Sequence, residues 1–248
     1  MTSASTQTSR RQDQPIGVLG AAPFVPLNRT HLEKNRIISF DGADERSLHF
    51  RVMRNQIVRD MDEESWQVLA VTSPTSECGV TVTAANLALS AAGQSDRNVL
   101  LVGLNADDSG PATCLGVHTS ASLNDYLEGR ACLGDVSVRA DIAGRNLVVI
   151  PSLIQADGPL DPTKAAQITN LIGLLRLEPG NPLIILDMPP LLSSSDVMSL
   201  IPAIDCALLV LAVGRSTASE LERCKECLEA TNILRIVLNK DREATGSP

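Results

Sequence analysis

Aromatic side chains are nearly absent from this sequence: they make up 2% of its 248 residues, and Tyr126 is the single tyrosine. A core with so few rings must be built from Leu, Val, Ile and Ala, which is typical of parallel sheets covered by helices. Long apolar runs are missing as well, since the longest, 183–186 and 206–213, fall far short of the ~20 residues that cross a bilayer. The Ser-, Thr- and Arg-rich first residues also lack the apolar segment of a signal peptide. We therefore expect no direct membrane insertion.

Positive charge is outnumbered: 21 Lys and Arg face 29 Asp and Glu, for a net charge of −8. This balance argues against a nucleic-acid surface, which needs clustered cations. The six cysteines are scattered, which favours reduced thiols over a disulfide framework. Cys224 and Cys227 form a CxxC pattern inside an expected helix, and we interpret it as helix packing. The three histidines are isolated, so they predict no metal site.

Short apolar strands alternate with helical segments along most of the chain. Strands are expected at 68–72, 98–103, 147–151, 183–186, 206–213 and 234–238, and helices at 45–61, 81–93, 122–127, 161–177, 195–200 and 217–231. This order predicts an α/β fold, a doubly wound, mostly parallel sheet with helices on both faces. We expect one domain over residues 36–240, between a disordered or loosely docked tail at 1–35 and a short polar tail at 241–248.

One segment, Ser73-Pro-Thr-Ser-Glu-Cys-Gly-Val-Thr81, joins an expected strand to an expected helix. A phosphate-binding loop occupies this position in nucleotide-binding folds and ends in Gly-Lys-Ser/Thr. Its backbone amides cradle phosphate, its lysine reaches the β- and γ-phosphates, and its hydroxyl ligates Mg²⁺. Here the end reads Gly79-Val80-Thr81, so the glycine and the hydroxyl are present and the cation is absent. The alternative is an ordinary turn in which Thr81 or Thr83 caps the helix.

Five further segments, before and after this loop, carry recognisable motifs in a fixed order along the chain. They are Phe50-Arg-Val-Met-Arg-Asn55, Val99-Leu-Leu-Val-Gly-Leu-Asn105, Ser122-Leu-Asn-Asp-Tyr-Leu-Glu-Gly129, Ile184-Ile-Leu-Asp-Met-Pro-Pro190 and Val237-Leu-Asn239. With the loop, they resemble the bacterial tyrosine kinases of capsule and exopolysaccharide synthesis, of the CpsD/CapB type, within the MinD/ParA superfamily of P-loop proteins. The resemblance covers roughly residues 37–240 and implies a P-loop NTPase-like domain.

The departures from the family pattern fall where its chemistry is performed. Val80 replaces the lysine, and Gly103 and Asn105 replace the pair of aspartates that organise Mg²⁺ and activate the attacking hydroxyl. Asp107-Asp108 stand where two arginines usually follow, which reverses the local charge. Phosphoryl transfer depends mainly on positioning and charge neutralisation. We therefore expect no competent kinase and no bound cofactor, with weak binding of ATP and Mg²⁺ left open.

The resemblance assigns roles to the residues that remain. Asp187 is the surviving carboxylate on the metal side, and with Thr81 it would hold Mg²⁺; alternatively it caps the turn at Met188-Pro-Pro190. Asn239 stands at the position that contacts the base, or is an ordinary residue at a strand end. The vestigial nucleotide site therefore comprises Gly79, Thr81, Thr83, Asp187 and Asn239.

Two further sets of residues bear on activity and assembly. Lys164 and Lys240 are the candidates to replace the missing lysine from elsewhere in the chain, unless a neighbouring chain supplies it. In the family, a helix carrying Glu-x-x-Arg-x-x-Arg inserts between subunits; here Leu48 replaces the acidic residue, while Arg51 and Arg54 remain. These two arginines are the candidate partner interface. A family-type ring is not expected, and self-association of another kind is left open.

Three functions compete on these grounds. The first is a catalytically degenerate, cytoplasmic regulator or scaffold of polysaccharide synthesis, held peripherally at the inner membrane by a membrane chain-length (co-polymerase) or export protein. The second is a weakly active tyrosine kinase or ATPase in the same pathway. The third, a partition- or septum-type ATPase acting on DNA or membrane, is disfavoured by the acidic balance and the short polar tail. The first is favoured.

Overall fold

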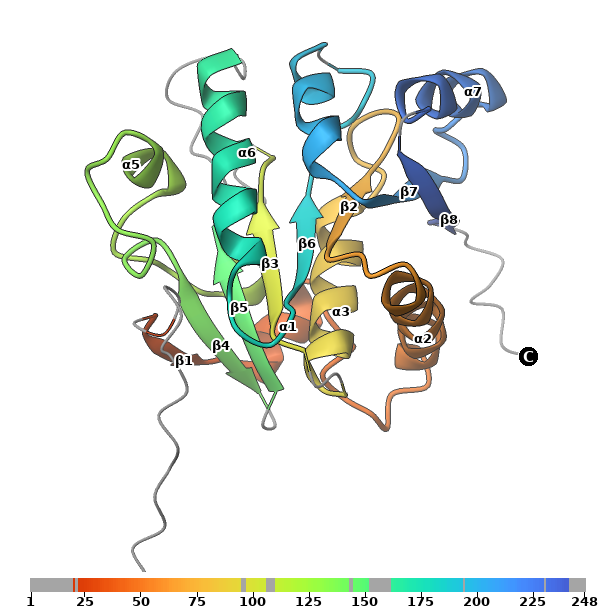
Figure 1. The fold of residues 1–248 in the computed structure, drawn as a ribbon. Helices are drawn as coiled ribbons and strands as arrows, with labels where there is room; N and C mark the ends of the chain where they lie inside the picture. Colours follow the sequence, from red (N-terminus) through yellow and green to blue (C-terminus); the bar gives the residue numbers. More distant parts are fainter. Residues whose placement is uncertain are drawn as a thin grey trace, which may run out of the picture.

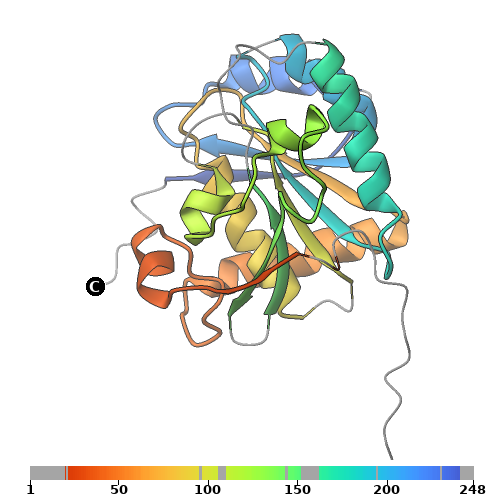
Figure 2. The same cartoon turned by 90° about the vertical axis from the view of Figure 1, so that its left-hand side faces the viewer.

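The computed structural model describes residues 20, 22–94, 97–105, 110–142, 145–151, 162–193, 195–229 and 231–240. An eight-stranded sheet runs through it in the order β1-β4-β5-β3-β6-β2-β7-β8. The strands are β1 (Phe24–Pro26), β2 (Val68–Thr72), β3 (Val99–Gly103), β4 (Val138–Ile142), β5 (Arg145–Ile150), β6 (Leu183–Asp187), β7 (Cys206–Ala212) and β8 (Asn232–Asn239). Helices cover both faces (Figures 1 and 2), so the doubly wound, mostly parallel α/β fold is confirmed.

The centre of the sheet explains the apolar runs of the sequence. Every residue of β2, β3 and β6 is buried, because helices cover both faces of these strands. All neighbouring strands run parallel except β4 and β5, which pair antiparallel with Val138 opposite Val149. β1 then pairs in parallel with β4 through three residues. Neither β1 nor β4 was expected from the sequence.

Two apolar cores lie on opposite faces of the sheet. One face is covered by α1 (Arg29–Lys34), α2 (Ser47–Glu63), α3 (Val80–Ala92) and α4 (Pro111–Leu115). The other is covered by α5 (Leu123–Leu127), α6 (Pro162–Arg176), the 3₁₀ helix η2 (Ser195–Ala203) and α7 (Ala218–Cys227). No helix of the described residues is both long enough and apolar enough to cross a membrane.

The expected boundary of the N-terminal tail at residue 35 is wrong for residues 22–35. This stretch contains β1 and α1, and Leu32 of α1 is fully buried in the core beside α3. Asn28 caps α1, because its side chain accepts a hydrogen bond from the backbone of His31 at 3.0 Å. The rest of that tail, apart from Gly20, and the expected C-terminal tail at 241–248 lie outside the described residues.

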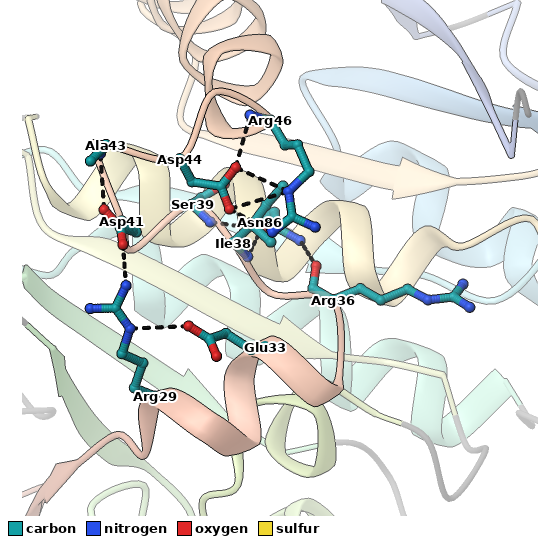
Figure 3. Close-up of polar contacts among 10 residues, drawn as sticks. All are labelled: Arg29, Glu33, Arg36, Ile38, Ser39, Asp41, Ala43, Asp44, Arg46 and Asn86. Carbon is teal, nitrogen blue, oxygen red and sulfur yellow. Dashed lines mark hydrogen bonds and ion pairs between the residues drawn. The ribbon is translucent and has the colours of Figure 1, made fainter. Parts of the chain in front are cut away.

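Asn86 in α3 fixes the next part of the chain, as Figure 3 shows. Its fully buried side chain accepts from the backbone of Ile38 at 2.8 Å and of Ser39 at 3.0 Å. The same amide donates to the carbonyls of Arg36 at 3.0 Å and Val82 at 2.9 Å. All four hydrogen-bonding positions of the amide are thereby used. The segment before α2 is thus joined directly to the helix that follows the loop of interest.

Candidate functional site

The loop of residues 73–79 lies where the sequence predicts it, between β2 and α3 at the carboxyl edge of the parallel strands. It borders a pocket of about 220 Å³. The pocket is lined by Ser73, Ser76, Glu77, Cys78, Gly79, Val80, Thr81, Val82, Asn105, Cys114, Met188 and Pro190. Ligands of doubly wound folds bind at this edge of the sheet. The pocket is therefore the candidate site.

The carbonyl groups of the loop are held by side chains around it. The Ser73 hydroxyl donates to the carbonyl of Thr75 at 2.7 Å, and the Thr83 hydroxyl donates to that of Gly79 at 2.8 Å. Asn239 and Lys240, which follow one another at the end of β8, donate to the carbonyls of Cys78 and Glu77 respectively. The loop shape is therefore maintained by the protein itself.

The backbone N–H groups of the loop, unlike its carbonyls, have few partners within the protein. Within the described part of the chain, no hydrogen bond to the protein is found for the N–H groups of Ser76, Glu77 and residues 79–81, while residues 75–78 form a turn. They lie at the N-terminus of α3, a helix of 13 residues, where the macrodipole adds positive potential. Such a row of free amides suits an oxygen anion. The loop backbone therefore remains compatible with the predicted phosphate site.

Val80 stands where a phosphate-binding lysine would begin, and it carries no charge. Its side chain is 8% exposed and belongs to the core on the α3 face. The pocket wall at this point is therefore apolar. Glu77 is the one acidic residue among the described residues that line the pocket, and none of these lining residues is Lys or Arg. The site lacks the cation that would neutralise a triphosphate.

Thr81, which lines the pocket, contacts Asp187 behind it. The Thr81 hydroxyl lies 3.0 and 3.2 Å from the two carboxylate oxygens of Asp187, which is fully buried at the end of β6. Gly103 is the register partner of Asp187 on β3, so a carboxylate at position 103 would stand beside it. Asn105 lines the pocket but is neutral. The described residues contain no group of three His, Cys, Asp or Glu that could hold a metal.

Asn239 rests on the loop. Its amide nitrogen donates to the Cys78 carbonyl at 2.9 Å, and its amide oxygen accepts from the backbone of Lys240 at 2.8 Å. A Cβ atom added to Gly79 would lie 2.3 Å from this nitrogen, and Gly79 also has a φ of +90°. Glycine is therefore required at position 79 by both contact and conformation. Asn239 here serves the loop, and a base would have to compete for its amide.

Cys114 is the pocket residue that could be mistaken for a nucleophile. Burial, together with the nearby charge of Asp187, raises the pKa of its thiol to about 11. The reactive thiolate is therefore scarce at neutral pH. Cys114 is a wall of the pocket and not a reactive group.

Known proteins with similar sequences are bacterial tyrosine kinases. No family model matches the chain. The tyrosine-protein kinase CpsD of Streptococcus agalactiae is 28% identical over 204 residues, which cover 80% of this chain and 85% of CpsD. The tyrosine-protein kinase Etk of Escherichia coli K12 is 26% identical over 192 residues, covering 76% of this chain and 26% of Etk. The chain is thus similar, over most of its length, to bacterial tyrosine kinases.

Solved structures agree with this family fold. The kinase domain of Escherichia coli Etk has a TM-score of 0.68 and 24% identity, over 86% of this chain and 84% of that chain. The septum site-determining protein MinD of Pyrococcus horikoshii, solved with Mg-ADP, has a TM-score of 0.59 and 23% identity, over 72% of each chain. The chain therefore shares the fold of these kinase domains and of MinD-like P-loop proteins.

The two candidate substitutes for the family's lysine differ in position. Lys240 reaches the loop and donates to the Glu77 carbonyl, whereas Lys164 lies in the first turn of α6 and does not line the pocket. Arg215, which follows β7, forms an ion pair with the Glu77 carboxylate. Our sequence reasoning missed Arg215. The signal was available, because the turn after β7 is also at a carboxyl end of the sheet.

The two arginines of the family's interface helix are placed differently from each other. Arg54 is 6% exposed and donates to the Ser90 carbonyl at 3.0 Å, so its position is at odds with a partner-contacting role. Arg51 is half-buried, and its buried Nε donates to no acceptor within the described residues. Of the two, Arg51 retains the larger exposed surface on α2. Asp107-Asp108, the predicted charge reversal, lie outside the described residues.

Proposed function

We propose that this protein is a catalytically degenerate member of the bacterial tyrosine-kinase family that acts as a regulator or scaffold of capsule or exopolysaccharide synthesis. The proposal rests on one observation. At the phosphate loop, Val80 presents methyl groups where a cation is needed, and Gly103 leaves Asp187 without a second carboxylate beside it. Removing one preorganised electrostatic group typically costs roughly 100- to 1,000-fold in rate. Three such groups are absent.

The residues present fit an oxygen anion better than a catalytic Mg–ATP complex. The free amides and Thr81 suit phosphate, while the neutral Val80 and Asn105 provide neither the cation nor the carboxylates that a metal-bound triphosphate requires. We therefore derive no phosphoryl-transfer step. The single tyrosine, Tyr126, is half-buried against the core, which also disfavours autophosphorylation.

Phosphotransfer assays test the proposed loss of activity. The purified protein, incubated with radiolabelled ATP and Mg²⁺, should yield neither phosphoprotein nor free phosphate above buffer. The triple variant Val80→Lys/Gly103→Asp/Asn105→Asp restores the absent groups and is the positive comparison; the same variant with Asp187→Asn is its matched control. Phosphorylation by the natural sequence that disappears in Asp187→Asn would show an active kinase and end the proposal.

A scaffold role makes a genetic prediction. We propose that the protein works at the cytoplasmic face of the inner membrane by binding a membrane chain-length or export protein, since relatives named tyrosine-protein kinase CpsD share most of their length with it. Deleting the gene should then change polymer amount or length, whereas Asp187→Asn should complement the deletion fully. Failure of Asp187→Asn to complement, at normal protein level, would favour catalysis over scaffolding.

A weakly active kinase or ATPase is the second candidate, and one observation favours it. Arg215 and Lys240 bring positive charge to the loop from other elements. If these cations sufficed for catalysis, slow ATP hydrolysis would be lost in Lys240→Met and retained in Lys164→Met. Equal rates in both variants would remove this candidate.

A further inference from the structure

The two edges of the sheet are built differently. β1, at one edge, has three residues and ends in Pro26, and short strands and prolines protect an edge from pairing with another chain. β8, at the other edge, has eight residues and contains no proline (Figure 1). No described strand pairs with its outer side. The outer side of β8 is therefore a strand edge without these protections.

Two apolar side chains of β8 face solvent. Ile236 and Leu238 are 44% and 59% exposed, whereas the residues between and around them in the strand are half-buried. Residues two apart in a strand share a face of the sheet. Leu211, the register partner of Leu238 on β7, packs against the core on the α7 side. Ile236 and Leu238 therefore form an apolar pair on the α7 face, at the edge of the sheet.

The backbone groups of the same two residues point away from the sheet. The carbonyl of Asn239 accepts a hydrogen bond from the backbone of Val213 at 3.0 Å, so the backbone groups of Asn239 face β7. Because backbone groups along a strand point alternately to its two sides, those of Val237 also face β7. Those of Ile236 and Leu238 face outward. These N–H and C=O groups suit an added strand, and the side chains beside them suit an apolar partner.

We propose that β8 pairs antiparallel with β8 of a second copy of this chain, about a two-fold axis at Val237, so that two sheets become one. Val237 is the midpoint of residues 235–239, over which the register with β7 is regular. The axis places Ile236 of each copy opposite Leu238 of the other, as apolar cross-strand neighbours. The same pairs exchange N–H···O bonds in an antiparallel ladder, as their outward backbone groups require. Side chains and backbone thus agree on one register.

Two neighbouring two-fold registers fit less well. An axis at Ile236 needs Leu234, which has no register partner on β7 because the register shifts there. An axis at Arg235 sets two guanidinium groups opposite each other, and like charges in that position are destabilising. In the proposed register Arg235 lies opposite the neutral Asn239. Charge and apolar surface therefore both select the axis at Val237.

The proposed interface is small. Two strands of this length bury less than the roughly 1,200 Å² at which stable interfaces begin, so we expect a reversible dimer. The inference holds whether or not the protein has kinase activity. In a scaffold, it would present every partner-binding surface twice.

Sedimentation velocity of the full chain, from about 1 µM to about 1 mM, tests the proposal. The natural protein should shift reversibly from monomer to dimer. Leu238→Pro removes an outward N–H group but no hydrogen bond to β7, so the dimer dissociation constant should rise about tenfold or more. Leu238→Lys, which places an ammonium group against Ile236, should act likewise. Leu177→Lys, at a leucine that is 80% exposed after α6, is the matched control and should leave the constant unchanged.

Cross-linking at one position tests the axis itself. A two-fold axis at Val237 brings the two copies of this residue face to face, at the Cα separation of about 4.5 Å that a non-hydrogen-bonded pair has and a disulfide accepts. In a Cys132→Ser/Cys227→Ser background, Val237→Cys should give a covalent dimer when diamide takes up the two thiol hydrogens. Leu177→Cys in the same background should cross-link far more slowly. Thermal melting establishes that each variant is folded.

Three results would overturn the proposal. The first is a natural protein that stays monomeric throughout this concentration range. The second is a dimer that Leu238→Pro and Leu238→Lys both leave intact, because another surface would then hold the copies together. The third is a dimer that forms only after residues 241–248 are removed, because this segment would then be the occupant of the edge.

Discussion

The Thr81 hydroxyl spans both carboxylate oxygens of Asp187, at 3.0 and 3.2 Å. These are the two side chains that would meet a metal ion in a working phosphate loop. Here they are in contact with each other, on adjoining elements α3 and β6. The buried carboxylate therefore has a neutral hydroxyl partner inside the protein, and the consequences for stability can be measured.

Asp187→Asn should stabilise the protein. The carboxylate of Asp187 is fully buried, and a neutral amide there avoids the cost of desolvating a charge while keeping the contact with Thr81. We expect the free energy of unfolding to rise by about 1 kcal/mol or more, as at functional sites that are kept at the expense of stability. Urea denaturation measures it. A loss of stability would instead assign Asp187 a structural role.

Asp205 is a second, half-buried carboxylate, and its partners include a cation. Arg176 donates to it at 2.8 Å, and the backbone amides of Gln67 and Val68 donate at 2.9 and 2.8 Å. Asp205→Asn should therefore destabilise the start of β2, by about 1–3 kcal/mol. Running both Asn variants in one urea series makes each the control for the other. If both variants changed the free energy of unfolding in the same direction, this explanation would be wrong.

The same carboxylate predicts a pH dependence. Burial opposes ionisation of Asp205, but the hydrogen bonds from Arg176 and the two amides outweigh it and hold its pKa below the ordinary value of 3.8. A lowered pKa means that the contribution to stability is complete above about pH 3.8 and is lost as the pH falls through the lower folded value. Asp205→Asn should flatten this part of the stability curve. An unchanged acid limb would show that other carboxyls govern it.

Asn86→Ala should loosen the segment before α2. The substitution removes the side-chain oxygen that accepts hydrogen bonds from the backbone N–H groups of Ile38 and Ser39. It also removes the amide nitrogen that donates to two backbone carbonyls, and all four bonds involve a fully buried side chain. We expect a loss of about 2–4 kcal/mol, because buried backbone groups are left unpaired. Hydrogen exchange should accelerate at Ile38 and Ser39 first. Asn98→Ala, which removes one exposed side-chain bond, is the control and should have little effect.

Gly79→Ala should strain the loop in two separable ways. The new Cβ would meet the Asn239 amide, and alanine disfavours a φ of +90°. We expect a loss of about 1–3 kcal/mol, measured by denaturant unfolding. Adding Asn239→Ala removes the contact but not the φ strain, so the double variant should recover part of the loss after correction for Asn239→Ala alone. Full recovery would assign the effect to contact alone.

The six thiols should react in a defined order with an aromatic disulfide reagent. Cys132 is exposed and should react first, followed by the half-buried Cys227. The buried Cys78, Cys114, Cys206 and Cys224 should react only on unfolding. Burial raises the pKa of Cys206 and Cys224 to about 12, which slows them further. In a Cys132→Ser variant, Cys227 should be the one thiol that is labelled early. Early labelling of any buried thiol in this variant would contradict the order.

The central strands could be predicted from sequence because burial on two faces leaves a continuous apolar run, as in β3 and β6. The peripheral elements could not. β1 has three residues and α1 has six, too few for a period to show, and β4 carries Arg139 and Asp141 at the less covered side of the sheet. Short length thus concealed β1 and α1, the elements that contradict the expected tail boundary, and partial burial concealed β4.

The candidate site divides in the same way. Thr81, Asp187 and Asn239 follow strands or precede a helix, and the topology of a parallel sheet brings such positions to one edge. The contacts of Glu77 depend instead on where long side chains from two separate turns point. Those directions follow from the left-handed backbone of Lys240 and from the turn in which the Ser216 hydroxyl accepts from the backbone of Ala212, neither of which a linear pattern encodes.

The three-residue ladder between β1 and β4 has a mechanical consequence. β1 and β8 lie at opposite edges of the sheet, so tension applied between them runs across the strands and passes through every strand pair in turn. Ladders loaded in this direction open bond by bond, and the shortest one yields first. Under load, β1 should therefore peel from β4 and lengthen the leading segment, while the sheet that carries the loop stays closed. Detachment of β1 would therefore take up the extension before the strands that carry the loop are loaded.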